Sequence, residues 1–218
     1  MIANEKEIFD GLKSLGFTDF ASAGIMANLW IESGFKPNNV QNTYEKYIGT
    51  DTEYTAKINA GDIHIEQFAN SPAGYGLAQW SAYSRKKALF AFVMEHSKDI
   101  SDLHDQLSFL ALECQNSGLF DKLNKCLSPF DAGVLFMLKF ERPKNQTEQA
   151  QKNRGNLAIR FYNDNVSSVS VIDKEMKLNR IFELVKETLK GKYGNGEQRK
   201  QALGSDYAIV QMIINAIM

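Results

Sequence analysis

The sequence has few of the residues that mark metalloproteins and disulfide-rich proteins. Only two cysteines, three histidines and four prolines occur among its 218 residues. Cys114 and Cys126 are not spaced as a metal-binding knuckle, so buried free thiols are the expected state of both. His64, His96 and His104 form no metal-ligand motif, and no histidine follows the two cysteines. Neither a metal site nor metal-dependent or thiol-dependent peptidase chemistry is predicted, and no cofactor is expected.

The sequence also lacks a strong charge of one sign and any long apolar run. Its formal net charge is −1, which gives no indication of binding to nucleic acid or to an anionic membrane. No apolar run approaches the length of a membrane span, so membrane insertion is not predicted. The first residues, MIANEKEIF, lack the layout of a signal peptide. We therefore expect synthesis in the cytoplasm, and an extracellular target would require release by another agent.

What the sequence does contain is helical periodicity over most of its length. Apolar residues repeat every three or four positions in residues 83–96, 101–116, 129–140 and 146–163. Periodicity fails in residues 38–73, which we predict to be an elaborate loop, with a small hairpin around Ile63 and Ile65 as the alternative. The length suits one medium domain and a small second module. We expect a mainly α fold.

A change in composition suggests where the first domain ends. Residues 165–177 contain the Ser/Val-rich run VSSVSVID, which we interpret as a linker, with a short strand as the alternative. Residues 178–218 regain helical periodicity and contain a glycine-rich break, YGNG. The predicted organisation is a domain over residues 1–164, a linker over 165–177 and a small three-helix bundle over 178–218.

One predicted helix is apolar almost all round and therefore belongs in the core. It lies in residues 19–37, DFASAGIMANLWIESGFKP. Asp19 is placed to cap its beginning, and Gly34 is placed to end it. Glu32 then lies in the last turn, where the helix dipole and an apolar environment both favour the protonated carboxylic acid. A protonated acid is what general acid catalysis requires, although a solvated glutamate at a helix end is the simpler interpretation.

A second notable stretch is GYGLAQW, residues 74–80. Its glycines permit close approach of the backbone to a ligand. Gln79 offers both a donor and an acceptor, and Trp80 offers a flat apolar face of the kind that contacts sugar rings. The alternative is a turn that leads into a core tryptophan.

Taken together, these motifs resemble those of known cell-wall enzymes. Glu-Ser-Gly-Phe-x-Pro at the end of a buried helix, followed by Gly-Leu-x-Gln, resembles the lysozyme and lytic-transglycosylase superfamily. The segments NEKEIFDGLKSLGFT, AGIMANLWIESGFKP, GYGLAQWSAYSR and KFERP resemble, in this order, the phage-tail-type lysozyme domain of phage lysins. The resemblance implies a lysozyme-like fold and an endolysin that cleaves bacterial peptidoglycan between N-acetylmuramic acid and N-acetylglucosamine.

The resemblance also implies roles for individual residues. It places the catalytic acid at Glu32 and a residue that orients it at Ser33. It places the cleft-lining motif at Gly76, Leu77 and Gln79. With the aromatic residues of the same stretch, the predicted substrate-binding residues are Ser33, Tyr75, Gly76, Gln79 and Trp80. One departure is that lytic transglycosylases have a short connection between the two motifs, whereas residues 38–73 intervene here. We expect this insertion to form one wall of the cleft.

Glycoside hydrolysis usually takes a second carboxylate, and the insertion offers several candidates. We favour Asp51 and Glu53, which lie in its most turn-like part, and either is otherwise a solvated loop acid. Glu45, Asp62 and Glu66 remain open. We expect Glu141, in KFERP, to pair with Arg154 or Arg160 in a structural role.

The C-terminal segment has a resemblance of its own. LVKETLKGKYGNGEQRKQALGSDYAIVQMIINAIM is similar to the CW-seven cell-wall-binding repeat of phage lysins. The implied wall-binding residues are Tyr193, Gly194, Asn195, Gly196, Arg199 and Asp206. A helix end without any ligand is the alternative. Because a single repeat provides no avidity, we also expect self-association through this module.

Two other functions remain open from the sequence. A non-hydrolytic lytic transglycosylase would use the same glutamate as acid and base. A catalytically inactive wall-binding or tail structural protein would retain the fold without the chemistry.

Overall fold

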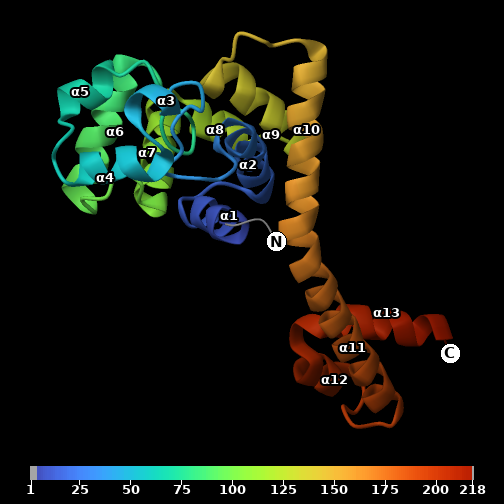
Figure 1. Ribbon diagram of the computed structural model, residues 1–218. Helices are drawn as coiled ribbons and strands as arrows, with labels where there is room; N and C mark the ends of the chain where they lie inside the picture. Colours follow the sequence, from blue (N-terminus) through green and yellow to red (C-terminus); the bar gives the residue numbers. More distant parts are fainter. Residues whose placement is uncertain (1–3, 218) are drawn as a thin grey trace. The chain divides into compact units, whose positions relative to one another are not determined.

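The computed structural model describes residues 4–217, and the side chains of all of these except residues 167–178, 205 and 216. The chain divides into two compact units, Met1–Asn165 and Val166–Met218. Within the described residues every regular element is helical, as the periodicity predicts (Figure 1). The elements of the first unit are α1 (Glu5–Ser14), α2 (Asp19–Ser33), α3 (Glu45–Ile48), α4 (Asp51–Asn59), α5 (Ile65–Asn70), α6 (Tyr83–His96), α7 (Leu103–Asn116), α8 (Leu119–Asn124), α9 (Pro129–Phe136), the π-helical turn η1 (Met137–Glu141) and α10 (Glu148–Tyr162).

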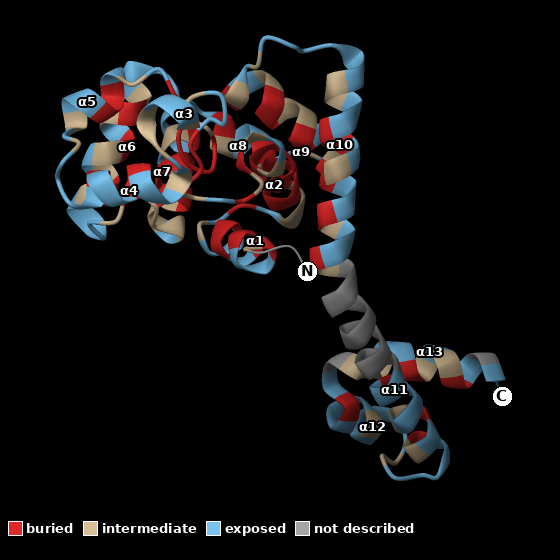
Figure 2. Ribbon diagram, in the orientation of Figure 1, coloured by how far each residue is buried: buried red, intermediate tan, exposed pale blue. Residues whose placement is uncertain are grey.

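Helix α2 is the centre of the first unit, and the prediction of a buried helix is confirmed. It packs against α1, α8, α9 and α10, and Figure 2 shows it as a buried element. Gly24 permits the close approach of α9, because a Cβ atom there would lie 2.6 Å from the carbonyl carbon of Ala132. The buried Asn28 side chain donates to the carbonyl oxygen of Gly133 at 2.9 Å. These contacts hold α2, whose C-terminal end lies at the candidate site, against α9.

The two ends of α2 agree only in part with the sequence. Gly34 adopts the left-handed conformation (φ 61°) and ends the helix, as predicted. The N-cap, however, is Thr18 rather than Asp19, because the Thr18 hydroxyl accepts a hydrogen bond from the backbone N–H of Ala21. Asp19 is the first helical residue, and its carboxylate lies 2.7 Å from the Lys13 ammonium group.

The prediction of a loop over residues 38–73 is wrong in its main part. The segment contains the short helices α3, α4 and α5, and Ile65 begins α5 rather than a hairpin strand. Thr50 and Glu53 form a capping box at the start of α4. Helices of four to nine residues show too few turns for a periodic pattern to be recognised. Isolated β-bridges instead join Tyr75 to both Val40 and Trp80.

The residues predicted to be a linker or a strand are also helical. They lie in the π-helical turn η2 (Asn163–Ser167) and in the first part of α11 (Ser168–Leu189). The run VSSVSVID contains neither glycine nor proline, and β-branched residues reduce helix stability by only a few tenths of a kcal/mol each, about 0.7 at most. Nothing in this run is therefore strong enough to stop a helix.

The second unit is the expected three-helix arrangement. It consists of α11, α12 (Gly196–Leu203), the 3₁₀ turn η3 (Gly204–Asp206) and α13 (Tyr207–Ile217). The helices share a small apolar core made by Ile181, Val185, Leu203, Val210 and Ile214. No helix in the described part of the chain is both long and apolar enough to cross a membrane.

Candidate active site

Glu32 lies at the C-terminal end of α2 and faces a polar pocket of about 420 Å³. The other lining residues carry mostly amide and hydroxyl groups: Asn39, Gln41, Asn42, Thr43, Gly74, Gln79 and Ser81. Glu32 is the one carboxylate among the described lining residues. The structure therefore brings Glu32 and Gln79 to the same pocket, as the sequence predicts for two of its candidate residues.

The rest of the pocket wall is formed mainly by the chain after α2 and by the GYGLAQW segment. The Gln79 side-chain amide donates to the carbonyl oxygens of Asn39 at 3.0 Å and Gly76 at 3.1 Å. The Gln41 backbone N–H donates to the carbonyl oxygen of Gly74 at 3.0 Å, and the Gly74 N–H donates to the Gln41 side chain at 3.2 Å. These bonds join two segments that are far apart in sequence into one surface.

Gln106 supports this wall from the protein interior, and no sequence motif pointed to it. Its fully buried side chain donates to the carbonyl oxygens of Pro37 and Ile100, at 2.7 and 2.8 Å, and accepts from the backbone N–H of Leu77 at 2.9 Å. Gly76 has φ 77°, and a Cβ atom there would lie 2.7 Å from Gln106 Oε1. Gly76 thus has a structural role, since it permits the close approach of this glutamine.

The buried Lys86 holds the segment that precedes GYGLAQW. Its ammonium group donates to the carbonyl oxygens of Ser71 at 2.9 Å and Ala73 at 3.0 Å. Burial lowers the pKa of Lys86 to about 8. The lysine lies 4.7 Å from the centroid of the Phe68 ring, so it anchors the segment between helix α5 and the pocket.

Two of the predicted substrate-binding aromatic residues belong to the core. Trp80 and Tyr75 have no exposed surface. The Trp80 indole N–H donates to Glu113 at 2.8 Å, and the Tyr75 hydroxyl lies 2.7 Å from the Thr55 hydroxyl. A fully buried ring presents no face to a sugar, so we correct the assignment of both residues to a structural one. Ser33 is buried as well, and its hydroxyl donates to the carbonyl oxygen of Leu29 at 3.0 Å.

The two favoured candidates for a second carboxylate do not line the pocket. Asp51 accepts a hydrogen bond from the backbone N–H of Val40 at 2.7 Å, and so supports the pocket wall from behind. Glu53 accepts from the backbone N–H and hydroxyl of Thr50, each at 3.0 Å. The backbone hydrogen bond from Thr50, followed by the hydroxyl bond, lowers the pKa of Glu53. Asp51 therefore joins the segment at Val40 to the start of α4, whereas Glu53 caps α4.

The partner of Glu32 is Arg154, one of the two arginines expected to pair with Glu141. Arg154 Nη2 lies 2.6 Å from Glu32 Oε1, and their side chains are 7% and 24% exposed. The alternative partner of Glu141, Arg160, pairs with Asp164 instead. The expected structural ion pair of Glu141 is therefore wrong, because Arg154 on α10 faces the end of α2.

Glu141 is instead a partly buried acid close to several charges. Its Oε1 atom is buried and accepts no hydrogen bond from any described residue. Burial raises the pKa of Glu141 well above its usual value, and the nearby charge of Glu32 raises it further, whereas Arg85 and Arg154 oppose the shift. Arg85 is already engaged by Glu113, at 2.6 and 2.8 Å. The site thus contains two carboxyl groups that interact with Arg154: Glu32 through a direct ion pair and Glu141 through its electrostatic effect.

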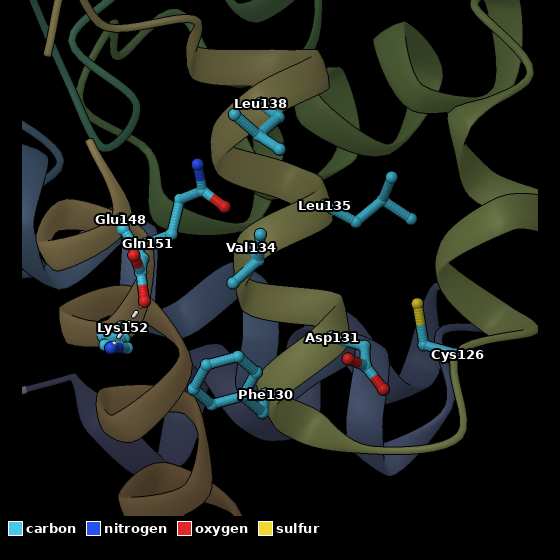
Figure 3. A pocket seen from close by; sticks show the side chains of 9 residues that line it. All are labelled: Cys126, Phe130, Asp131, Val134, Leu135, Leu138, Glu148, Gln151 and Lys152. Carbon is cyan, nitrogen blue, oxygen red and sulfur yellow. Dashed lines mark ion pairs between the residues drawn. The ribbon is translucent and has the colours of Figure 1, made fainter. Parts of the chain in front are cut away.

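Another pocket, of about 550 Å³, lies along α9 and α10 (Figure 3). Its lining is mainly apolar and includes Phe130, Val134, Leu135 and Leu138. The ion pair between Glu148 and Lys152 lies at its margin. It contains none of the residues predicted for catalysis or substrate binding. Within the described part of the chain, no group of three or more histidine, cysteine or acidic side chains is arranged to hold a metal ion.

In the second unit, most of the predicted wall-binding residues make internal contacts. Arg199 donates to the carbonyl oxygen of Gly194 at 3.0 Å, to Asn195 at 2.8 Å and to Gln211 at 3.0 Å. Asp206 accepts from Arg180 at 2.7 Å.

The glycine-rich loop that contains several of these residues is held by a hydrogen bond and by packing on the apolar core. The Tyr193 hydroxyl donates to Glu187, and the Tyr193 ring packs against the apolar core. Gly194 and Gly196 have φ 64° and 56°, so both adopt the left-handed conformation that glycine favours. Gly196 has open space around its Cα atom. Of the predicted wall-binding residues in this loop, Asn195 and Gly196 are exposed, whereas Tyr193 and Gly194 are partly buried.

The mainly helical fold, with a carboxylate at the end of a central buried helix and a polar pocket before it, is that of a lysozyme-like enzyme. Comparison with known families agrees with this class. The phage tail lysozyme family matches residues 3–164, and the CW_7 repeat matches residues 183–218. The chain belongs to the phage tail lysozyme family. No curated protein matches it. The two family matches identify the protein as a lysozyme-like enzyme that acts on peptidoglycan and carries a cell-wall-binding repeat. They confirm the resemblance found in the sequence.

Proposed function

We propose that the protein is a muramidase that cleaves the glycan strand between N-acetylmuramic acid and N-acetylglucosamine, with Glu32 as the general acid. The observation that carries this proposal is the position of Glu32, on the pocket side of the last turn of α2. A carboxylic acid at this position would protonate the glycosidic oxygen as the bond to the anomeric carbon breaks.

The pocket lining supports a sugar as the ligand. Asn39, Gln41, Asn42 and Gln79 contribute amide groups, and Thr43 and Ser81 contribute hydroxyl groups. Amides and hydroxyls both donate and accept hydrogen bonds, which suits the hydroxyl and acetamido groups of amino sugars. The volume of about 420 Å³ lies in the range typical of small-molecule sites, about 300–1,000 Å³.

The attacking water has no second carboxylate beside it among the described lining residues. We propose that polar groups of the wall position the water, with Gln79 as the main candidate. In the structure its side-chain nitrogen is used in bonds to Asn39 and Gly76, which leaves its oxygen as the atom available to accept from water.

The same observation favours one alternative, a lytic transglycosylase. That reaction needs only one carboxyl group, which protonates the leaving oxygen and then accepts a proton from the muramic acid 6-hydroxyl as it closes on the anomeric carbon. Mass spectrometry of the products from purified walls separates the two reactions. Reducing N-acetylmuramic acid ends would support the muramidase, and 1,6-anhydro ends would support the alternative. Release of peptides without glycan cleavage would refute both.

We further propose that the second unit holds the enzyme on the wall and that residues 165–177 connect it to the catalytic domain. Asn195 and Gly196 lie on the exposed surface of its glycine-rich loop. Met212 and Ile217 of α13 are 63% and 60% exposed, which gives a surface for self-association. Removal of residues 178–218 should abolish sedimentation with walls while cleavage of soluble glycan continues. Light scattering on the intact chain should report a species larger than the monomer.

A further inference from the structure

The charged side chains around Glu141 leave hydrogen-bonding atoms without partners among the described residues, and the proposed reaction offers a way to pair them. Four charged side chains influence it electrostatically, each from a different helix: Glu32 of α2, Arg85 of α6, Glu113 of α7 and Arg154 of α10. Arg85 is bonded to Glu113 through two nitrogens and lies 4.5 Å from the centroid of the Phe140 ring. Arg154 is therefore the arginine that still has a nitrogen available for another hydrogen bond.

Two polar atoms in this cluster are buried and unpaired. They are Oε1 of Glu141 and Nη1 of Arg154, and neither has a hydrogen-bond partner among the described residues. One is an acceptor and the other is a donor, so each is the partner that the other lacks. Buried unpaired polar atoms are unfavourable, and a catalytic role is one of the reasons for which native structures retain them.

The ion pair in the structure places the Arg154 guanidinium group 2.6 Å from the carboxyl group of the proposed general acid, Glu32. A guanidinium group beside a carboxylate favours the ionised form, whereas a general acid must carry a proton. The proton is instead favoured on Glu141, whose pKa is raised first by burial and then by the charge of Glu32. Ser81 lines both the pocket of Glu32 and a neighbouring pocket lined by Glu141, so the two carboxyl groups face adjoining space.

We propose that Glu141 is a positioning residue that stores the catalytic proton and exchanges it with Glu32 while Arg154 moves the other way. This inference rests on the proposed role of Glu32. In the exchange, the O–H bond of Glu141 breaks and an O–H bond forms on Glu32. The hydrogen bond from Arg154 to Glu32 is replaced by one from its Nη1 atom to Oε1 of Glu141.

The exchange conserves both charge and protons. Before and after the exchange, one carboxyl group carries the proton and the other accepts a hydrogen bond from the guanidinium group. Glu32 then passes the proton to the glycosidic oxygen, and the water that adds to the anomeric carbon releases one proton, which restores the pair. The two unpaired atoms of the resting structure become partners in the exchanged state.

The pH profile of Glu141→Gln tests this proposal. We expect kcat/KM on soluble glycan fragments to fall roughly 10²-fold at pH 7, the size of a general acid contribution of about 10²–10⁴. The alkaline limb of the profile should move to lower pH by about one unit or more, because Glu32 is left with Arg154 and without a stored proton. Glu141→Asp should restore part of the activity at pH 7.

The matched control is Glu148→Gln, which makes the same chemical change on α10 at a side chain that is 81% exposed. It should retain the wild-type profile. If Glu141→Gln lowers activity equally at all pH values, or leaves the profile unchanged, the exchange is refuted while the role of Glu32 stands. Activity in Glu32→Gln would instead overturn the proposed function and the exchange with it.

A measurement on the unmodified protein makes the test independent of how the variant folds. Carbon-13 NMR of the glutamate carboxyl groups reports their protonation directly. We expect one glutamate of the wild-type protein to remain protonated at pH 7, and its signal to be absent from Glu141→Gln. Full ionisation of every glutamate at pH 7 would overturn the proposal.

Discussion

Replacement of Trp80 by alanine distinguishes a core residue from a sugar-binding one. In the structure Trp80 is fully buried, its ring centroid lies 5.7 Å from that of Phe109, and its indole N–H donates to Glu113. Truncation of a buried tryptophan typically costs about 3–5 kcal/mol of stability. For a domain of this size about 1 kcal/mol corresponds to 2–4 °C, so the melting temperature of the first unit should fall by roughly 6–20 °C.

Trp80→Phe is the matched variant, because it keeps an aromatic ring and removes the N–H donor. A hydrogen bond to a charged group contributes about 1.5–3 kcal/mol, and Glu113 retains Arg85 as a partner, so the loss should lie near the lower value. Circular dichroism gives the melting temperature, and cleavage of soluble glycan is measured at a temperature where all variants are folded. If Trp80→Ala kept the wild-type melting temperature but raised KM, our placement of the ring would be wrong.

Three further changes test other parts of the structure. Arg199→Ala removes three internal hydrogen bonds donated by a charged group, each worth about 1.5–3 kcal/mol, so the thermal stability of the second unit and its wall binding should decrease together. Loss of binding alone would indicate direct contact with the wall. Gly24→Ala should destabilise the first unit by about 1–3 kcal/mol in chemical denaturation because its Cβ meets α9, and a rise in stability would contradict that packing. Glu141 has a raised pKa in the folded state, so its contribution to stability is complete below its ordinary pKa of 4.5 and is lost as pH rises through the folded-state pKa. The melting temperature of Glu141→Gln relative to wild type should therefore increase from pH 4 to pH 8, and a constant difference would refute the shift.

The sequence was sufficient to predict the central helix and the acid at its end. Residues apolar on every side indicate a buried helix without any knowledge of its neighbours, and Gly34 marks the end by its backbone conformation. These local signals place Glu32 correctly in the last turn. The motifs that follow are short but occur in a fixed order, which is why the family was recognised from them.

The partners of the site residues were not predictable in the same way. Arg154 lies 122 positions after Glu32, and which face of α10 meets the end of α2 depends on packing against α9. A tryptophan suits both a core and a sugar-binding wall, so Trp80 alone gave no decision. The acids of α4 appeared available because a helix of nine residues is too short to be recognised from its periodicity. In the structure Asp51 accepts from the N–H of Val40 and Glu53 from the N–H of Thr50, and neither lines the pocket of Glu32.

Hydrolysis of soluble peptidoglycan fragments by Glu32→Gln tests the central claim most directly. The substitution keeps the shape of the side chain and removes the proton donor at the end of α2. We predict a loss of kcat of at least about 10²-fold, with unchanged circular dichroism and unchanged sedimentation with cell walls. Activity within a few-fold of wild type would show that Glu32 is not the general acid.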